Sequence, residues 1–270
     1  MLLRAVLLAF VVLLAGAAPA QQESRPLDEL LAGVEPLSIA GLEGRTETAV
    51  YRGTRLVSGR EVITSVTMTL REEQLNREYH VPAEWPHGQK PLEDVLALSF
   101  RENWEENGSA FTRAWDLYRA EQTRKMGGVT VAPAGTVAWE LQLWRERPVR
   151  VHLSHRDGEG SAQRSFARTR LDFFEEELPL ILRQLAPEPG MSAAFRLFPT
   201  QGEGAIEPLE PAPARLRAEE TGEGLAVFVE VADGREIRYE FDPEPPHALR
   251  TMEHNDGRRL ERQSLRWREQ

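Results

Sequence analysis

Two groups of glutamates are the residues of this chain best suited to acid–base chemistry. They are Glu175, Glu176 and Glu177, and Glu102, Glu105 and Glu106. Cleavage of a glycosidic bond requires a pair of carboxylates, so Glu175 and Glu102 are the candidate residues of a hydrolase. In a chain with 43 acidic residues such groups also arise by chance, and acids at 175–177 suit the start of a helix. The sequence therefore favours a solvated face or a helix start here, and it assigns no catalytic residue.

Four histidines are candidate metal ligands. His152 and His155 have the spacing H-x-x-H, which on a helix lets both rings reach one metal. The surrounding alternation predicts a strand instead, on which residues three apart point to opposite faces. His80 and His87 flank a loop that contains Glu84, but two histidines and one glutamate do not make a known zinc ligand set. We therefore expect neither a metal nor a cofactor.

Residues 157–161 have the sequence Asp-Gly-Glu-Gly-Ser, with oxygen-bearing side chains at alternate positions as in a calcium loop. The segment lacks the length and the terminal bidentate glutamate of such a loop. Its serine also lacks the G-x-S-x-G spacing of a hydrolase nucleophile. A hairpin turn is the favoured interpretation.

Six tryptophans are candidate binding residues, because aromatic side chains exposed on a sheet or loop bind sugars and lipids. They are Trp85, Trp104, Trp115, Trp139, Trp144 and Trp267. Trp139 falls on the apolar face of a predicted strand, Trp144 on its opposite face, and Trp85 in a proline-flanked loop. The rim of a core is the favoured interpretation of this set.

Alternation of apolar and polar residues predicts antiparallel strands from about residue 46 onward. The alternating runs are 62–70, 137–143, 149–153, 225–231 and 237–241. Residues 92–100 are read as a strand rather than a helix, because Leu96, Leu98 and Phe100 alternate. Asp-Gly at 157–158, 233–234 and 256–257, and more weakly Ser-Gly at 58–59, predict hairpin turns, since tight turns need a positive φ. The proline-rich stretch 199–213 predicts an irregular connection.

One segment in this β-rich pattern has the period of a helix. Its apolar face consists of Leu178, Ile181, Leu182 and Leu185. This spacing predicts a short amphipathic helix that packs onto a sheet, with Pro179 in its first turn. A second short helix or an ordered tail is expected within residues 21–45, where Ser24 suits a cap and Pro26 a first turn.

The first twenty residues have the order of a secretory signal peptide. Arg4 supplies the positive charge, residues 5–14 are apolar, and Ala18-Pro19-Ala20 is a small-residue cleavage pattern. Cleavage is expected after Ala20, since the apolar run is too short for a membrane anchor. The predicted location is therefore periplasmic or secreted, with no integral membrane segment after cleavage.

Composition narrows the class of protein further. The chain has 270 residues, no cysteine and a formal net charge of −10. An exported chain without cysteine is stabilised by packing and hydrogen bonds rather than by disulfides. Its acidity makes it a poor candidate for binding nucleic acid.

These elements predict a mainly β fold in a single β-rich domain over residues 46–270. One short helix cannot cover the face of a long antiparallel meander, so the sheet is expected to curl on itself. The predicted architecture is a meander curled into a barrel, half-barrel or sandwich, with one or two short helices.

The last hundred residues or so carry short recurring motifs. Glu177-Leu178-Pro179 leads into Leu182-Arg183 and then Pro189-Gly190, and terminal hairpins follow. This pattern resembles uncharacterised extracytoplasmic β-rich proteins of bacteria, of the domain-of-unknown-function type. The resemblance implies a β-rich, periplasmic type of fold and carries over no catalytic residue.

The sequence therefore favours a non-enzymatic binding or cell-envelope module. Its expected ligand is an apolar or amphiphilic envelope molecule on a concave sheet surface, because the mouth of a curled sheet is a common ligand site. The alternative is a carboxylate-dependent hydrolase acting on an envelope polymer. Two acids facing each other in a tryptophan-lined cleft would favour the hydrolase, and acids on outer faces would favour the binding module.

Overall fold

The fold is described from a computed structural model of the chain. The described residues are 25–31, 39, 41–57, 59–76, 92–119, 123–132, 135–144, 149–155, 161–166, 172–198, 211–222 and 224–269, and between 123 and 166 the description is of the backbone alone. None of the helices in these ranges combines the length and apolar character needed to cross a membrane.

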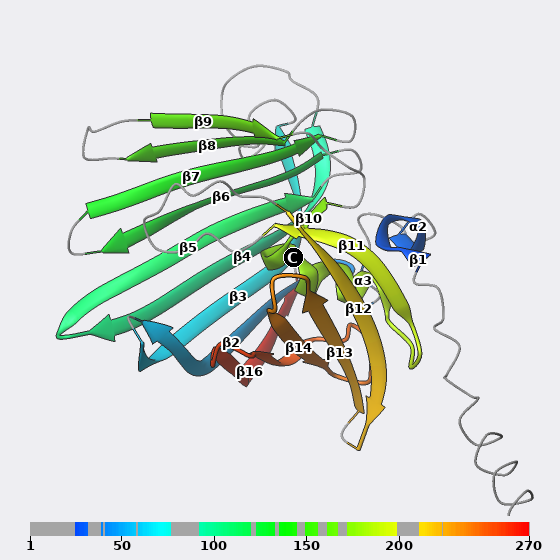
Figure 1. Ribbon diagram of the computed structural model, residues 1–270. Coiled ribbons are helices and arrows are strands. Elements are labelled where there is room, and N and C mark those ends of the chain that lie inside the picture. The colour runs from blue at the N-terminus through cyan, green and yellow to red at the C-terminus, as the bar shows by residue number, and fades with distance from the viewer. Residues whose placement is uncertain are drawn as a thin grey trace, which may run out of the picture.

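The larger part of the molecule is an antiparallel meander of long strands (Figure 1). The strands are β2 (Arg45–Val57), β3 (Arg60–Asn76), β4 (Leu92–Glu106), β5 (Ser109–Arg119), β6 (Thr123–Ala132), β7 (Gly135–Trp144), β8 (Val149–His155) and β9 (Ser161–Phe166). Each pairs with the next along the chain. The strand predicted at 92–100 is thereby confirmed, and it continues six residues further than expected.

A second meander follows near the C-terminus. It consists of β11 (Ser192–Phe198), β12 (Ala212–Thr221), β13 (Gly224–Val231), β14 (Glu236–Phe241), β15 (Leu249–His254) and β16 (Arg259–Glu269). Two short strands, β1 (Arg25–Pro26) and β10 (Asp172–Phe174), pair in parallel with β11. Of the proline-rich stretch 199–213, residues 199–210 lie outside the described residues, and β12 begins at Ala212.

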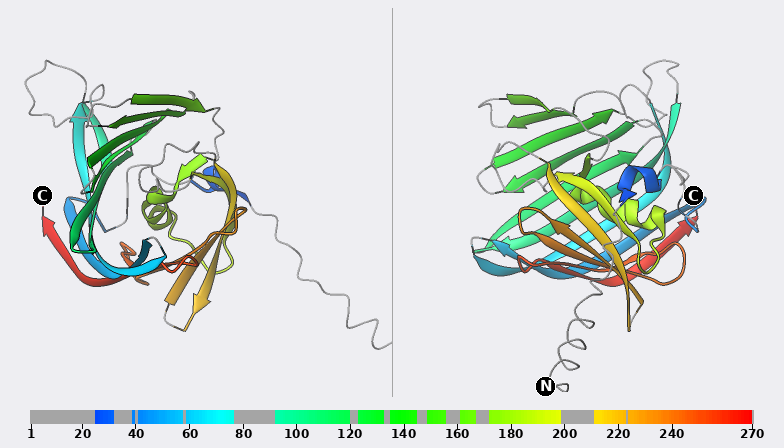
Figure 2. Two further views of the ribbon diagram at one scale, coloured as in Figure 1. Left: turned by 60° about the vertical axis from the view of Figure 1, so that its left-hand side comes forward. Right: turned by 45° about the vertical axis from the view of Figure 1, so that its right-hand side comes forward.

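The two meanders join into one sheet because β16 pairs antiparallel with β2. The order is β1-β11-β12-β13-β14-β15-β16-β2-β3-β4-β5-β6-β7-β8-β9, and in the described part of the chain its two end strands do not pair with each other. The sheet curves around an interior without closing (Figure 2). The predicted mainly β fold with a curled meander is confirmed, in its open form.

The close approach of β16 to β2 depends on one glycine. Gly53 pairs with Leu260, and a Cβ at position 53 would lie 1.7 Å from the carbonyl oxygen of Arg259. No side chain fits at that distance, so glycine is required for this pairing.

Three short helical segments complete the described elements. They are α2 (Leu27–Leu31), η1 (Glu175–Glu177) and α3 (Leu178–Leu185). The helix predicted in the N-terminal region is shorter than expected. Pro26, placed by the sequence in its first turn, belongs instead to β1, where it pairs with Ala194 of β11.

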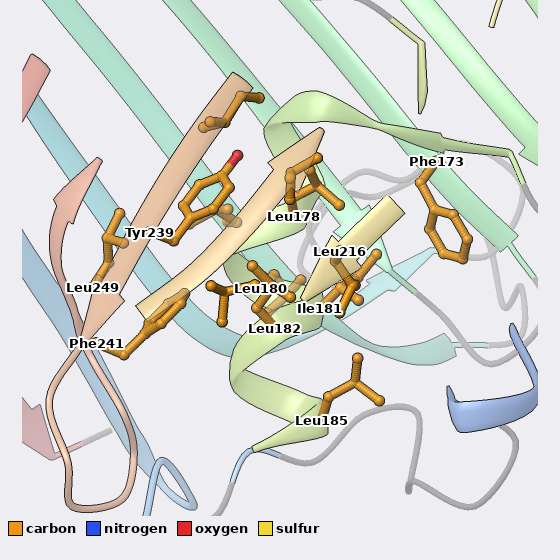
Figure 3. Packing of buried hydrophobic residues seen from close by; sticks show 14 of the residues in the cluster. Phe173, Leu178, Leu180, Ile181, Leu182, Leu185, Leu216, Tyr239, Phe241 and Leu249 are labelled. Carbon is orange, nitrogen blue, oxygen red and sulfur yellow. The ribbon is translucent and has the colours of Figure 1, made fainter. Parts of the chain in front are cut away.

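Helix α3 lies inside the curve of the sheet, as Figures 1 and 2 show. The four predicted apolar residues are buried, and Pro179 stands in the first turn, as expected. Every other residue of α3 is buried too, because strands surround the helix rather than covering one face. Figure 3 shows its leucines between Leu216 on one side and Tyr239, Phe241 and Leu249 on the other.

One ion pair fixes α3 to the sheet. The Arg183 guanidinium donates to both carboxylate oxygens of Glu47 on β2, at 2.9 and 2.6 Å, and its Nε donates to the carbonyl of Pro246 at 2.9 Å. Both side chains are buried. Removing either side chain of this buried pair would destabilise the protein, because the remaining charge would be left without compensation.

Hairpin turns lie where the sequence predicts them at three of four places. Gly234 connects β13 to β14 and Gly257 connects β15 to β16, each with φ of 92°, and Gly59 precedes β3 with φ of 76°. The turn predicted at 157–158 lies outside the described residues. A further turn at Asn107-Gly108 connects β4 to β5, with φ of 50° and 77°.

Candidate functional site

The candidate site is a cluster of polar side chains around Glu175, at the point where η1 enters the interior of the sheet. Arg235 donates through Nη1 to Glu175 Oε2 at 2.7 Å, and Arg258 Nη2 lies 3.6 Å from Oε1. Glu175 is only 5% exposed. The prediction of a solvated face is therefore wrong for this residue, although its place at the start of a helical segment is confirmed.

Two hairpin turns with the same tripeptide, Asp-Gly-Arg, deliver these arginines. In the first, Asp233 accepts hydrogen bonds from the backbone N–H and the Nε of Arg235, at 3.1 and 2.9 Å. In the second, Asp256 accepts the equivalent two bonds from Arg258, at 3.0 and 2.9 Å. Each aspartate thus orients its arginine so that the terminal nitrogens reach Glu175.

His254, the last residue of β15, completes the cluster. Its Nδ1 lies 3.0 Å from Nη2 of Arg258 and 3.8 Å from Oε1 of Glu175. Burial, reinforced by the charge of Arg258, lowers the pKa of His254 to about 4, so the ring is neutral at pH 7. A guanidinium only donates, so Nδ1 accepts and the ring proton is assigned to Nε2.

A cavity of about 40 Å³ lies between this cluster and the inner face of β3, β4 and β5. Met68, Leu98, Phe100 and Trp115 form its apolar wall, and Glu175, Tyr239, His254 and Arg258 lie on its polar side. Phe100 and Trp115 stack with ring centres 4.8 Å apart, so this part of the wall is aromatic. The space suits a group of a few atoms and does not hold an alkyl chain.

Four buried donors of residues that line this cavity lack a hydrogen-bond partner among the described residues. One is Nε of the charged Arg113, and the other three belong to uncharged side chains: the hydroxyl of Tyr239, Nε2 of His254 and Nε1 of Trp115. Burial raises the pKa of Tyr239 well above its ordinary value, so its hydroxyl keeps its proton. A buried donor left unpaired costs about 1–3 kcal/mol. The unpaired donors at this cavity therefore lower the stability of the folded protein.

Glu102, the other candidate acid, belongs to a separate cluster on the inner face of β4. It accepts from Thr64 at 2.9 Å and from Arg55 at 3.2 Å, and its Oε2 lies 3.3 Å from Nη2 of Arg113. Like Glu175 it is 5% exposed, so a solvated face is wrong here too. Its neighbours Glu105 and Glu106, by contrast, are exposed and half-buried.

The two acids do not form a free acid–base pair. Each carboxylate has two guanidinium groups around it, which is the arrangement of a buried ion pair. Arg113 connects the two clusters, because it pairs with Glu102 and also lines the cavity beside Glu175. Neither of the two expected patterns is found, since the acids lie on no outer face and do not oppose each other across a tryptophan-lined cleft in the described part of the molecule.

The histidine and calcium candidates are only partly within the described structure. His152 and His155 lie on β8, as predicted, with the backbone alone described. His80, Glu84 and His87 lie outside the described residues, as do residues 157–160. Within the described ranges, no three acidic or histidine side chains are grouped so as to hold a metal.

The tryptophans divide in the same way. Trp104 and Trp115 are buried on the inner face of the sheet, whereas Trp267 on β16 is 38% exposed. Arg55 lies over the ring of Trp104, 4.1 Å from its centre. Trp139 and Trp144 are on β7 with the backbone alone described, and Trp85 is outside the described residues.

The pairing register connects the cavity wall to the neighbouring strands β6 and β7. Met68, Phe100 and Trp115 are cross-strand neighbours, and the backbone pairing continues through Gly128 of β6 to Trp139 of β7.

Chemically, the arrangement around Glu175 offers hydrogen-bond donors beside an apolar wall. Sequence reasoning found Glu175 and both Asp-Gly turns but missed Arg235, Tyr239, His254 and Arg258. The repeated Asp-Gly-Arg was the available signal. No family model matches the chain, no curated protein or solved structure shows significant similarity to it, and its resemblance to extracytoplasmic β-rich proteins stays a prediction.

Proposed function

We propose that the chain is an exported, non-enzymatic binding protein that holds an apolar or amphiphilic molecule against the inner face of its curled sheet. One observation carries the proposal: the cavity beside Glu175 is lined both by apolar side chains and by residues with unpaired buried donors. An amphiphile has the matching division between an apolar part and a polar group. Export to the periplasm or beyond rests on the predicted signal peptide of residues 1–20.

The size of the cavity determines how such a ligand would lie. About 40 Å³ accepts the polar group alone. The apolar part would follow the row of Met68, Phe100 and Trp115 toward β6 and β7, where the backbone pairing continues.

Binding of the fluorescent probe 1-N-phenylnaphthylamine tests the proposal. The protein is expected to bind it saturably, with the blue-shifted emission of an apolar site. Met68→Gln places an amide on the apolar wall and should weaken binding at least about fivefold, equivalent to about 1 kcal/mol. Ile63→Gln is the matched control, because Ile63 lies on the same strand but is 60% exposed.

The outcomes separate clearly. Saturable binding that is weakened by Met68→Gln and unaffected by Ile63→Gln supports the proposal. Absence of saturable binding, or equal effects of the two variants, contradicts a site on the inner face.

A further inference from the structure

We propose that the cavity beside Glu175 recognises an uncharged carbonyl group, as in an ester or amide, through the donors of Tyr239, His254 and Trp115. The inference rests on the proposed function and specifies the polar part of the ligand. Its starting point is that three uncharged side chains lining one small space each carry a buried donor with no partner among the described residues.

The hydrogen-bonding character of these atoms identifies an acceptor. The indole Nε1 of Trp115 only donates. His254 uses Nδ1 to accept from Arg258, which leaves Nε2–H to donate. Tyr239 keeps its proton because it is fully buried. A ligand group that supplied donors would leave Trp115 and His254 unpaired, whereas a group with lone pairs can accept from any of the three donors.

The charges around the cavity favour a neutral acceptor over an anion. The lining residues include two acids, Glu175 and Glu176, and two arginines, Arg113 and Arg258, and the His254 ring is neutral at pH 7. A carboxylate or phosphate would add a buried negative charge beside Glu175, which is costly because Arg258 and Arg113 already pair with Glu175 and Glu102. A cationic group would meet donors instead of acceptors. An ester or amide carbonyl adds two acceptor lone pairs and no charge.

The volume agrees with this assignment. About 40 Å³ is room for a few atoms, which an ester or amide group fills. The stacked rings of Phe100 and Trp115 line the same cavity as Tyr239 and His254. An alkyl chain attached to the carbonyl would therefore extend away from the donors along an apolar surface.

The test compares amphiphiles that share one chain length, by displacement of 1-N-phenylnaphthylamine from the full-length mature protein. Monododecanoylglycerol carries an ester carbonyl, and dodecylglycerol ether has the same polar end without the carbonyl. Dodecanoate and dodecyltrimethylammonium supply the anion and the cation. We expect the ester to bind about tenfold more tightly than the ether, corresponding to one good hydrogen bond of about 1.4 kcal/mol, and more tightly than either ion.

Variants that remove one donor each test whether these donors cause the preference for the ester over the ether. Tyr239→Phe and Trp115→Phe each remove one donor and keep an aromatic ring, so each should reduce the advantage of the ester over the ether. Tyr51→Phe is the matched control: the Tyr51 hydroxyl is equally buried but donates to the carbonyl of Leu249 at 3.0 Å and does not line the cavity. It should leave the ester-to-ether ratio unchanged.

A readout without ligand completes the experiment. Tyr239→Phe should leave the melting temperature of the free protein unchanged or raise it, because it removes an unpaired buried hydroxyl. Tyr51→Phe should lower it. Equal binding of ester and ether, or tightest binding of dodecanoate, would overturn the inference while leaving the proposed function standing. Failure of all four amphiphiles to displace the probe would overturn both.

Discussion

His254 should make the stability of this protein depend on pH in the mildly acidic range. Its pKa in the folded protein is about 4, against an ordinary value of 6.5, chiefly because the ring is buried. As the pH falls below 6.5, His254 binds a proton in the unfolded chain but not in the folded protein, so acidification favours unfolding. Each pKa unit is worth about 1.4 kcal/mol, which puts the full effect at about 3 kcal/mol. The contribution is complete above pH 6.5 and is lost as the pH falls toward 4.

Urea unfolding followed by tryptophan fluorescence measures this effect. Between pH 7 and about 4.5, the free energy of unfolding should fall by about 2 kcal/mol more in the wild-type protein than in His254→Gln, which cannot take up a proton in that range. The difference between the two proteins is the useful quantity, because carboxylates common to both titrate in the same range. His247→Gln is the control, since His247 lies outside the Glu175 cluster and its Nδ1 donates to the carbonyl of Asp242 at 3.0 Å.

A parallel loss of stability in wild type and His254→Gln would contradict the lowered pKa of His254, because the ring would then bind a proton equally well in the folded and unfolded protein. A wild-type protein that becomes more stable than the variant on acidification would contradict it too. That result would mean that Glu175, 3.8 Å away, outweighs burial and the charge of Arg258.

Three further changes have expected outcomes. Leu182→Ala should lower the free energy of unfolding by about 2–5 kcal/mol in urea titrations, since the side chain is fully buried in the middle of α3, and a loss below about 0.5 kcal/mol would place the helix at the periphery. Gly53→Ala should cost at least about 1–3 kcal/mol through overlap with the carbonyl of Arg259, whereas Gly222→Ala, with open space around it, should be close to neutral in the same assay. N-terminal sequencing of the exported protein should begin at Gln21, and a sequence starting at Met1 would refute signal cleavage.

The strands and most turns were predictable because their signals are local. Alternation shows which residues of a strand share a face, and a glycine after an acid marks the positive φ of a tight turn. Asn107-Gly108 is the same kind of signal and could have been read in advance. The alternation of Leu98 and Phe100 also continues to position 102, so the burial of Glu102 was implied by the pattern of its own strand.

The site was not predictable in the same way, because its parts are brought together by pairing between distant segments. Glu175 reaches Arg235 and Arg258 only when η1 enters the interior near the turns of the second meander. Local periodicity also understated the burial of α3. It identified one apolar face, whereas a curled sheet surrounds the helix and buries Arg183 as well, with Glu47 as its partner.

The joining of β16 to β2 has a consequence for how the chain acquires its shape. Arg45 pairs with Glu269, so the first long strand waits for the last strand, and contacts between such distant positions slow folding because a long loop must close. A nascent chain that ends before Arg259 therefore lacks the strand that joins the two meanders.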